Sequence, residues 1–181
     1  MGLPGLEHGI GEAWRLRRHR PFPSRRRGVL MERIRLEFPE QRLVHRHAMT
    51  IRVSDINYGQ HLGHDSVVSL AHEARGQAWQ ALGFPEWDVD GLMSIVSDLA
   101  VQYQGEGKLG DALVVETAMD PVSGKGLGVH HRLVRVGDGS VLATVRVGLV
   151  FAGPDGLAVP SARVSGEIER TVAALACEVA R

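Results

Sequence analysis

Residues 66–82, SVVSLAHEARGQAWQAL, are the stretch of sequence from which the fold can be worked out. They contain no proline, and their apolar residues recur at the spacing of a helix with one buried face. Gly83 and Pro85 follow, which predicts that the helix ends at residue 82. The residues of the apolar face are Val67, Leu70, Ala71, Ala74, Ala78, Ala81 and Leu82. Because most of these side chains are small, we expect the helix to lie close against a sheet.

Five segments around this helix have the pattern of β-strands. One precedes the helix, and there alternate residues from Leu43 to Val53 would share one face of a strand. Short turns join the other four, and Gly137-Asp138-Gly139 is typical of a hairpin, so neighbouring strands should run antiparallel. The five segments are residues 41–53, 92–104, 111–119, 127–136 and 141–151.

The order of these elements, one strand, one helix and then four strands, predicts an α+β fold with a helix packed on an antiparallel sheet. Residues 162–179 predict a second helix at the C-terminus. Between the first strand and the central helix, residues 54–64 (SDINYGQHLGH) are polar and contain two glycines, which indicates a loop.

Residues 52–75, RVSDINYGQHLGHDSVVSLAHEAR, resemble the first motif of hotdog-fold acyl-CoA thioesterases of the 4-hydroxybenzoyl-CoA thioesterase type. That motif is roughly D-x-D-x-x-G-H-V-N-N, followed by a helix that closes in E-E-A-R. Asp55 matches its first acid, His61 its histidine, and Glu73-Ala74-Arg75 the end of its helix. The resemblance continues through Tyr103, Gly110-Asp111 and Gly139, and it covers about residues 41–160.

This resemblance implies a hotdog fold, in which an antiparallel sheet of about five strands wraps around one long central helix. It also implies a homodimer or homotetramer with active sites at the subunit interface. The expected substrate is an acyl-CoA or acyl-carrier thioester, with coenzyme A as part of the substrate and no separate cofactor.

The sequence departs from the family's motif at the residue usually credited with catalysis. The second acid of D-x-D is Asn57 here, and an amide cannot act as a base or as a carboxylate nucleophile. The family's glycine is Gln60, and its two asparagines are Gly63 and His64. The site must therefore work with a different acid or have no catalytic function.

Thioester hydrolysis needs hydrogen-bond donors for the developing oxyanion, and the amino-terminal end of a helix supplies them. The backbone N–H groups around Gly63 to Ser66 are the expected donors. Asp65 is the first candidate for the acid because it lies at the helix start, although a role as helix N-cap would also explain it. Asp55 is the second candidate, with loop ordering as its alternative role.

Further residues of the same segment complete the predicted site. His61 and His64 could orient water or the substrate carbonyl, and Asn57, Tyr58, Gly63 and Ser66 are expected to contact substrate. Some hotdog relatives place their acid on the central helix, which brings in Glu73, although an ion pair with Arg75 or a nearby loop is the simpler interpretation. His61 and His64 have a spacing compatible with metal ligands, but cysteine partners and an H-E-x-x-H motif are missing, so no metal is predicted.

Two other functions compete with thioester hydrolysis. One is a hotdog enoyl-CoA hydratase or dehydratase, because Asp55-Ile56-Asn57 and His61 loosely resemble the D-x-N-P-x-H element of that class without its proline. The other is a non-catalytic acyl-CoA binding protein, which the amide at position 57 favours. A shared fold cannot decide between these functions.

The amino-acid composition limits which classes of protein the chain can belong to. The 181 residues carry 21 Lys+Arg against 21 Asp+Glu, and 44% are hydrophobic, which is ordinary globular composition. No apolar run reaches the ~20 residues needed to span a bilayer, so no membrane span is expected. The single cysteine, Cys177, cannot form an internal disulfide, and we expect a cytoplasmic protein.

Residues 1–30 differ from the rest because they hold seven arginines against two glutamates. A nucleic-acid or membrane arm would need interleaved aromatic residues or an amphipathic period, which this segment lacks, so no nucleic-acid partner is predicted. The remaining interpretations are a disordered tail or a mis-assigned start, with Met31 as the true beginning. Residues 31–181 are predicted to form a single hotdog domain.

Overall fold

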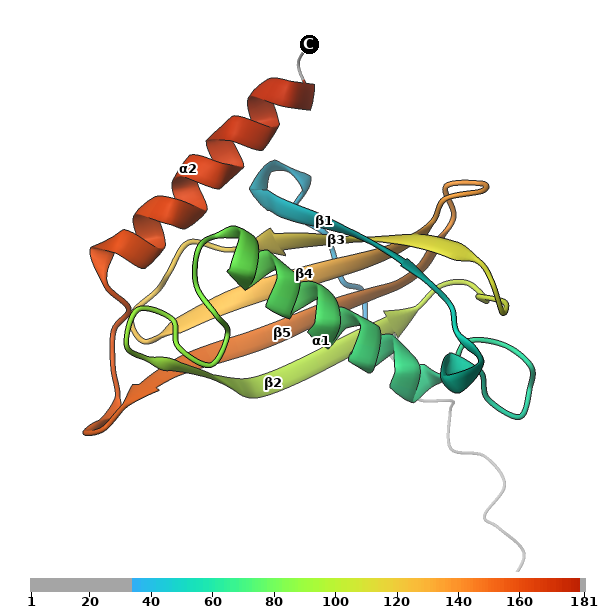
Figure 1. The fold of residues 1–181 in the computed structure, drawn as a ribbon, viewed down its shortest axis with the longest axis horizontal. Helices are drawn as coiled ribbons and strands as arrows, with labels where there is room; N and C mark the ends of the chain where they lie inside the picture. The colour runs from blue at the N-terminus through green and yellow to red at the C-terminus, as the bar shows by residue number, and fades with distance from the viewer. Residues whose placement is uncertain (1–33, 180–181) are drawn as a thin grey trace, which may run out of the picture. The chain divides into compact units, whose positions relative to one another are not determined.

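An antiparallel sheet curls around helix α1 in the computed structural model, which describes residues 34–179 (Figure 1). The strand order in the sheet is β1-β3-β4-β5-β2, and a short strand β6 pairs with β5. The strands are β1 Leu43–Thr50, β2 Met93–Tyr103, β3 Ala112–Met119, β4 Gly126–Arg135, β5 Val141–Gly153 and β6 Gly156–Leu157. The helices are α1 His64–Ala81 and α2 Ala162–Val179, with 3-10 turns η1 Glu40–Arg42 and η2 Val53–Asp55.

These elements confirm the predicted hotdog fold, with one long helix held by an antiparallel sheet of five main strands within the described residues. The order of the elements and the antiparallel pairing are as the turn signals predicted. β5 runs two residues beyond the predicted end because it also pairs with β6. The domain prediction for residues 1–30 concerns a segment outside the described residues and stays a prediction.

Helix α1 packs its small-residue face on the concave side of the sheet. Val67, Leu70, Ala71, Ala74 and Ala78 are all buried, as the periodicity predicted. Short side chains at these positions allow the helix backbone to approach the strands closely. The core between helix and sheet is completed by strand residues such as Leu113, Val115, Val129, Leu133 and Val145.

The predicted apolar face is wrong at Ala81, which is the last residue of α1 and is exposed. Trp79 closes this end of the core instead, and its ring lies edge-on to those of Phe84 and Phe151, with centroids 6.4 and 6.1 Å apart. Arg75 is also buried on α1, where Glu86 neutralises its charge. The helix begins at His64, two residues before the predicted start.

Strand β1 is shorter than predicted, and Val53 is not part of its inner face. The strand ends at Thr50, and Val53 is 77% exposed in the turn η2. Asp55 stabilises the turn, because its carboxylate accepts the backbone N–H of Arg52 at 2.8 Å.

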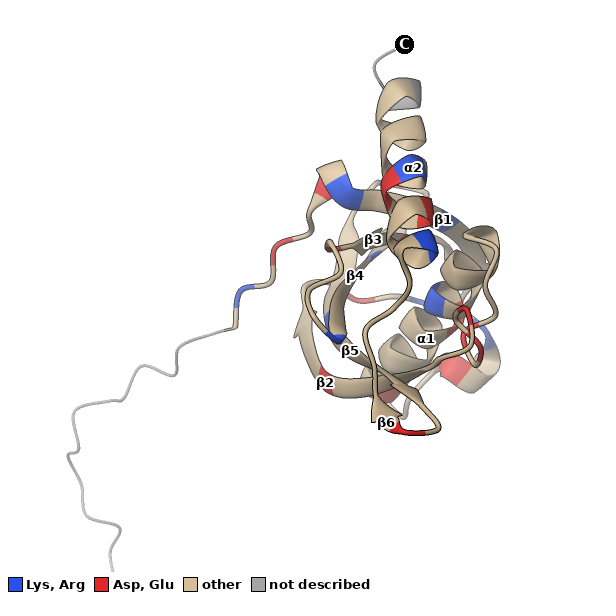
Figure 2. Ribbon diagram, turned by 90° about the vertical axis from the view of Figure 1, so that its left-hand side faces the viewer, with Lys and Arg blue, Asp and Glu red and all other residues tan. Residues whose placement is uncertain are grey.

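Helix α2 spans the residues predicted for it and packs beside β1 (Figure 2). Val164 and Ile168 enter the core, and Arg42 forms two hydrogen bonds with the carboxylate of Glu169, at 2.7 and 2.8 Å. Neither α1 nor α2, the two α-helices of the described part, is long and apolar enough to cross a membrane.

Candidate active site

The amino-terminal end of α1 has no side-chain cap. Gly63 is the N-cap residue, with extended backbone angles of φ −64° and ψ 145°. The backbone N–H groups of His64, Asp65 and Ser66 belong to the first turn and have no acceptor within the helix. They give this end a partial positive charge and can stabilise an oxyanion.

Asp65 is the second residue of the helix, and its carboxylate folds back over Gly63. A Cβ atom added to Gly63 would lie 2.5 Å from Oδ1 of Asp65 and 3.3 Å from Oγ of Ser66. A side chain at position 63 would therefore displace this carboxylate. The N-cap role considered for Asp65 is wrong, because Gly63 holds that position, and the carboxylate is exposed at the positive end of the helix.

Tyr103, the last residue of β2, reaches the same helix end. Its hydroxyl donates a hydrogen bond to the carbonyl oxygen of His64 at 3.0 Å. Burial raises the pKa of Tyr103, and the negative charge of Asp65 raises it further, which places the phenol within electrostatic reach of that carboxylate. The sequence offered Tyr103 only as part of the family's motif and gave no signal that it meets the helix start, since Tyr103 and His64 are 39 residues apart.

Asn57 organises the loop that leads into α1. Its Oδ1 accepts the backbone N–H of Gly59 at 2.8 Å, and its Nδ2 lies 3.4 Å from Nδ1 of His61. Its backbone pairs with Gln60 and His61 through bonds of 3.0 Å. The amide thus fixes the loop and the ring of His61.

The other residues of this loop that were predicted to belong to the site lie in different surroundings. The hydrogen bond and the charge of Lys108 lower the pKa of Glu106, and His61 lies near the same carboxylate. His64 is exposed at the start of the helix, and Tyr58 is fully exposed to solvent. Within one chain, Gly63, His64 and Ser66 therefore lie at the helix start. The ring of His61 lies beside Asn57, and Tyr58 projects outward.

Asp55 has the properties of a structural residue. It is buried, and its carboxylate accepts hydrogen bonds from the backbone and guanidinium of Arg52 and from Ser54. Burial alone would raise the pKa of Asp55, but these bonds outweigh burial and lower it. Its backbone carbonyl also accepts the N–H of Gly63 at 2.8 Å, so Asp55 positions the helix start while its side chain is already fully used.

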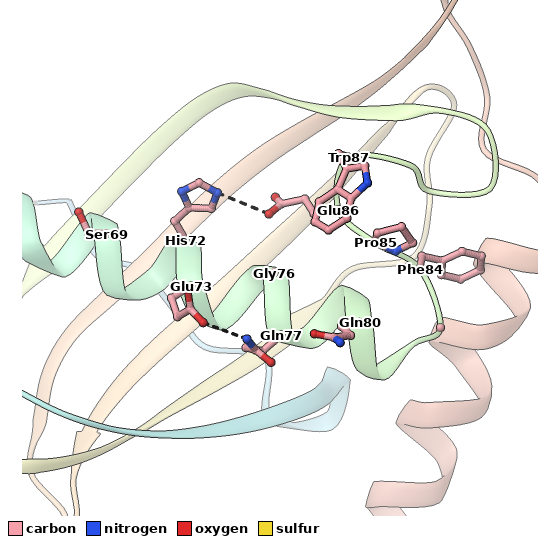
Figure 3. A pocket seen from close by; sticks show the side chains of 11 residues that line it. Ser69, His72, Glu73, Gly76, Gln77, Gln80, Phe84, Pro85, Glu86 and Trp87 are labelled. Atoms are coloured by element: carbon pink, nitrogen blue, oxygen red, sulfur yellow. Dashed lines mark hydrogen bonds and ion pairs between the residues drawn. The ribbon is translucent and has the colours of Figure 1, made fainter.

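A pocket of about 760 Å³ runs along the exposed side of α1 (Figure 3). Ser69, His72 and Glu73 line it from the helix, and the loop after the helix forms its far wall. Glu73 accepts a hydrogen bond from Gln77 at 2.9 Å. The predicted ion pair between Glu73 and Arg75 is wrong, because the guanidinium of Arg75 turns inward to Glu86.

Among the described residues, no group of three or more His, Cys, Asp and Glu side chains could hold a metal ion. His61 and His64 do not converge with Asp65 on one point. The absence of a metal remains a prediction of the sequence.

Comparison with known proteins identifies the family. A model of the thioesterase-like superfamily matches residues 51–162, which is more than half of the chain. The chain belongs to the thioesterase-like superfamily, and the predicted class of enzyme, a thioesterase, is thereby confirmed. No curated protein sequence matches the chain.

Solved structures share the fold at low sequence identity. The 1,4-dihydroxy-2-naphthoyl-CoA thioesterase of Synechocystis has a TM-score of 0.62 and 11% identity, over 72% of this chain and 96% of its own. A gentisyl-coenzyme A thioesterase has a TM-score of 0.62 and 14% identity, over 68% and 99%. A mutant of 4-hydroxybenzoyl-CoA thioesterase in complex with 4-hydroxybenzoyl-CoA has a TM-score of 0.63 and 16% identity, over 70% and 99%.

Proposed function

We propose that this protein hydrolyses an acyl-CoA or acyl-carrier thioester at the amino-terminal end of α1. The observation that carries the proposal is the exposed carboxylate of Asp65, folded over Gly63 beside the free N–H groups of the first turn. Membership of the thioesterase-like superfamily supports the reaction, as do two structural neighbours that are coenzyme A thioesterases.

In the proposed reaction, the thioester carbonyl oxygen accepts hydrogen bonds from the N–H groups of residues 64–66. Asp65 accepts a proton from a water molecule while the water oxygen attacks the carbonyl carbon. The tetrahedral intermediate then collapses, the carbon–sulfur bond breaks, and the thiolate takes a proton from the carboxyl group or from solvent. The products are a carboxylic acid and a free thiol. His64 and Tyr103 flank this position, and Asn57 holds the loop that precedes it.

Glu73 is the second candidate for the acid. It lies eight residues after Asp65 on α1, about 12 Å further along the helix axis. It is exposed and lines the 760 Å³ pocket, and its one hydrogen bond within the described residues comes from Gln77. Asp65 is preferred because it is adjacent to the oxyanion donors.

We further propose that the functional unit is at least a homodimer joined through β2. This strand is at the end of the sheet, so one of its edges has no neighbour within the described residues. Most of its exposed side chains are apolar, with Ser97 and Asp98 as the polar exceptions, which is unusual for an edge strand that stays in water. The exposed apolar residues of β2 are Met93, Ile95, Val96, Leu99 and Tyr103.

Antiparallel pairing of two β2 strands would make the active site composite. In each chain, β2 begins beside the loop that follows α1 and ends beside the start of α1 (Figure 1). A two-fold axis through the middle of β2 would place Asp65 and Tyr103 of one protomer near the beginning of its partner's β2. The pocket along α1 of one chain would then face the oxyanion donors of the other.

Non-catalytic acyl-CoA binding is the second candidate function, and Asn57 favours it. The structural neighbour in complex with 4-hydroxybenzoyl-CoA is an Asp-to-Asn mutant, so a protein of this fold can hold its ligand after such a change. Nothing in the described part of the chain favours the hydratase alternative over these two.

Free-thiol release from acetyl-, hexanoyl-, palmitoyl- and benzoyl-CoA tests the proposal. We expect the wild type to release stoichiometric coenzyme A from at least one of these. Loss of enoyl absorbance from crotonyl-CoA without thiol release would show a hydratase instead. Ligand-dependent thermal stabilisation without turnover would show a binding protein.

A further inference from the structure

The peptide group between His64 and Asp65 has two hydrogen-bonding sides with different roles. Its N–H belongs to Asp65 and is one of the proposed oxyanion donors, whereas its C=O belongs to His64. A trans peptide group is planar, and its N–H and C=O point in opposite directions. A contact that fixes the carbonyl oxygen of His64 therefore also fixes the direction of the Asp65 N–H.

The hydroxyl of Tyr103 makes such a contact, because it donates a hydrogen bond to the carbonyl oxygen of His64 at 3.0 Å. In an α-helix, the N–H four residues later occupies one lone pair of a carbonyl oxygen, so the phenol can occupy the other. Hydrogen bonds that share a peptide group polarise one another. A donor on the C=O of His64 therefore makes the N–H of Asp65 a stronger donor.

The strand that carries Tyr103 is held on both sides of this residue. Tyr103 is the last residue of β2 and pairs with Ala143 of β5. Directly after it, the backbone N–H groups of Gln104 and Gly105 both donate to the carbonyl of Leu142, at 2.8 and 3.0 Å. The sheet therefore presents the phenol from a fixed point.

Backbone hydrogen bonds hold the helix start from the other side. The N–H of Gly63 donates to the carbonyl of Asp55 at 2.8 Å. The N–H of Leu62 donates to the carbonyl of Gly107 at 2.9 Å. Both donors precede the helix, so these bonds do not use the N–H groups of residues 64–66. The bond from Tyr103 acts one residue further along the chain, on the first turn itself.

The surroundings of the phenol keep it protonated, as a hydrogen-bond donor must be. Burial raises the pKa of Tyr103, and the negative charge of Asp65 raises it further. An ionised phenol has no proton to donate to a carbonyl oxygen. At neutral pH the hydroxyl of Tyr103 is therefore a donor.

We propose that Tyr103 is a positioning residue of the oxyanion hole, whose hydroxyl orients the His64–Asp65 peptide group and strengthens the N–H of Asp65 as a donor. The inference deepens the proposed thioester hydrolysis and rests on it. The carbonyl oxygen of a bound thioester has only a partial charge, whereas the tetrahedral intermediate has a full negative charge there. A stronger donor favours the intermediate more than the bound substrate, so its effect belongs to kcat.

The kinetics of thiol release by Tyr103→Phe, which keeps the ring and removes only the hydroxyl, test the proposal. On the best substrate of the wild type, we expect kcat to fall about tenfold and KM to change less than about twofold. Removal of an oxyanion donor costs ~100-fold or more, and the loss is smaller here because the N–H of Asp65 remains. An unchanged kcat, or a change in KM alone, would overturn the proposal.

Thr144→Val is the matched control for the loss of a hydroxyl hydrogen bond near the end of β2. Oγ1 of Thr144 donates to Oε1 of Gln104 at 2.7 Å, and neither residue belongs to α1. Both variants should be slightly less thermostable than the wild type, but only Tyr103→Phe should lose kcat. Equal losses of kcat in the two variants would show that the hydroxyl of Tyr103 only supports the fold.

The amide signal of Asp65 in nuclear magnetic resonance spectra gives a readout that does not require turnover. Its nitrogen should move upfield in Tyr103→Phe, because the N–H is less polarised, and should stay in place in Thr144→Val. If this shift is seen and the wild type releases no thiol, the proposed hydrolysis fails and the donor strengthened by Tyr103 stands. An unmoved Asp65 signal in Tyr103→Phe would overturn the inference even in an active enzyme.

Discussion

Gln60 is the residue at which the loop before α1 differs most from an ideal backbone. Its φ angle is 61°, in the left-handed region that favours glycine, and the family's motif has glycine at this position. Hydrogen bonds of the loop, including the one from its own N–H to the carbonyl of Asn57, hold it there. The sequence showed the departure from the motif but could not show that the backbone had kept the glycine conformation.

Gln60→Gly should therefore stabilise the fold. We expect the free energy of unfolding to rise by about 0.5–1 kcal/mol. The strain of glutamine in the left-handed region costs more free energy than the extra conformational entropy that glycine gives the unfolded chain. Urea unfolding measures this change, with Gln60→Ala as the control that keeps the strain. A Gln60→Gly variant that is less stable than Gln60→Ala would contradict the conclusion that the backbone at position 60 is strained.

His131 is buried in the core, where Oγ1 of Thr117 is 3.1 Å from its Nδ1. Burial lowers the pKa of His131 to about 3, and the nearby charges of Arg75 and His130 act in the same direction. Between about pH 3 and 6.5 the unfolded chain therefore binds a proton that the folded protein does not bind. This contribution to stability is full above the unfolded pKa and is lost as the pH falls through this window.

We expect the free energy of unfolding to fall by up to about 1.4 kcal/mol per pH unit between about pH 6.5 and 4.5. Most carboxylates titrate below this range, and burial also lowers the pKa of His45, so the slope is the sum of these two histidines, of which His131 is the fully buried one. In urea unfolding, the free energy of unfolding of His131→Gln should depend much less on pH. His64→Gln, at an exposed position, should keep the wild-type slope. Identical slopes in the wild type and His131→Gln would refute this explanation.

At the scale of elements, α1 and the loop after it depend on one buried ion pair. The side chains of Arg75 and Glu86 are 8% and 17% exposed, and they join the middle of the helix to the loop that carries Trp87. Breaking a buried pair by removing one partner is costly because the other charge stays buried.

Glu86→Gln should lower the free energy of unfolding by about 3 kcal/mol, the lower end of the range for buried pairs because Glu86 is partly exposed. The exposed pair Lys108–Glu106 provides the control, and Lys108→Gln should cost no more than about 1 kcal/mol. Equal effects of the two variants in urea unfolding would show that burial does not distinguish the pairs.

The elements themselves could be predicted because their signals are local. Alternation, helical spacing and glycine turns gave the strands and both α-helices to within a few residues. Val53 and Arg75 could not be predicted in the same way. Their placement depends on partners: the Asp55 turn ends β1 early, and Glu86 makes a buried arginine possible. Likewise, Asp65 could be predicted as a site residue because it lies at the helix start in the sequence. Tyr103 could not, because only the folded sheet brings the end of β2 to the helix start.

At the scale of the whole molecule, the composite active site that we propose requires a partner for β2. Ile95→Lys/Leu99→Lys places two charges on the exposed apolar edge, where Ile95 is 41% and Leu99 is 45% exposed. We expect light scattering to show that this variant is a monomer. Its rate of thiol release should also fall, because the pocket of one chain and the oxyanion donors of the other would no longer meet. Val136→Lys, at an exposed residue outside β2, should stay dimeric. A folded, active monomer would contradict the composite site.

The most direct test of catalysis at the start of α1 is the rate of thiol release by Asp65→Asn and Glu73→Gln, measured beside the wild type on its best substrate. Loss of the general base should lower kcat at least about 100-fold in Asp65→Asn, with Glu73→Gln staying within a few-fold of the wild type. Both variants should remain folded, since neither side chain is buried. Full activity of Asp65→Asn together with an inactive Glu73→Gln would move the acid to the middle of α1 and contradict the proposed role of Asp65.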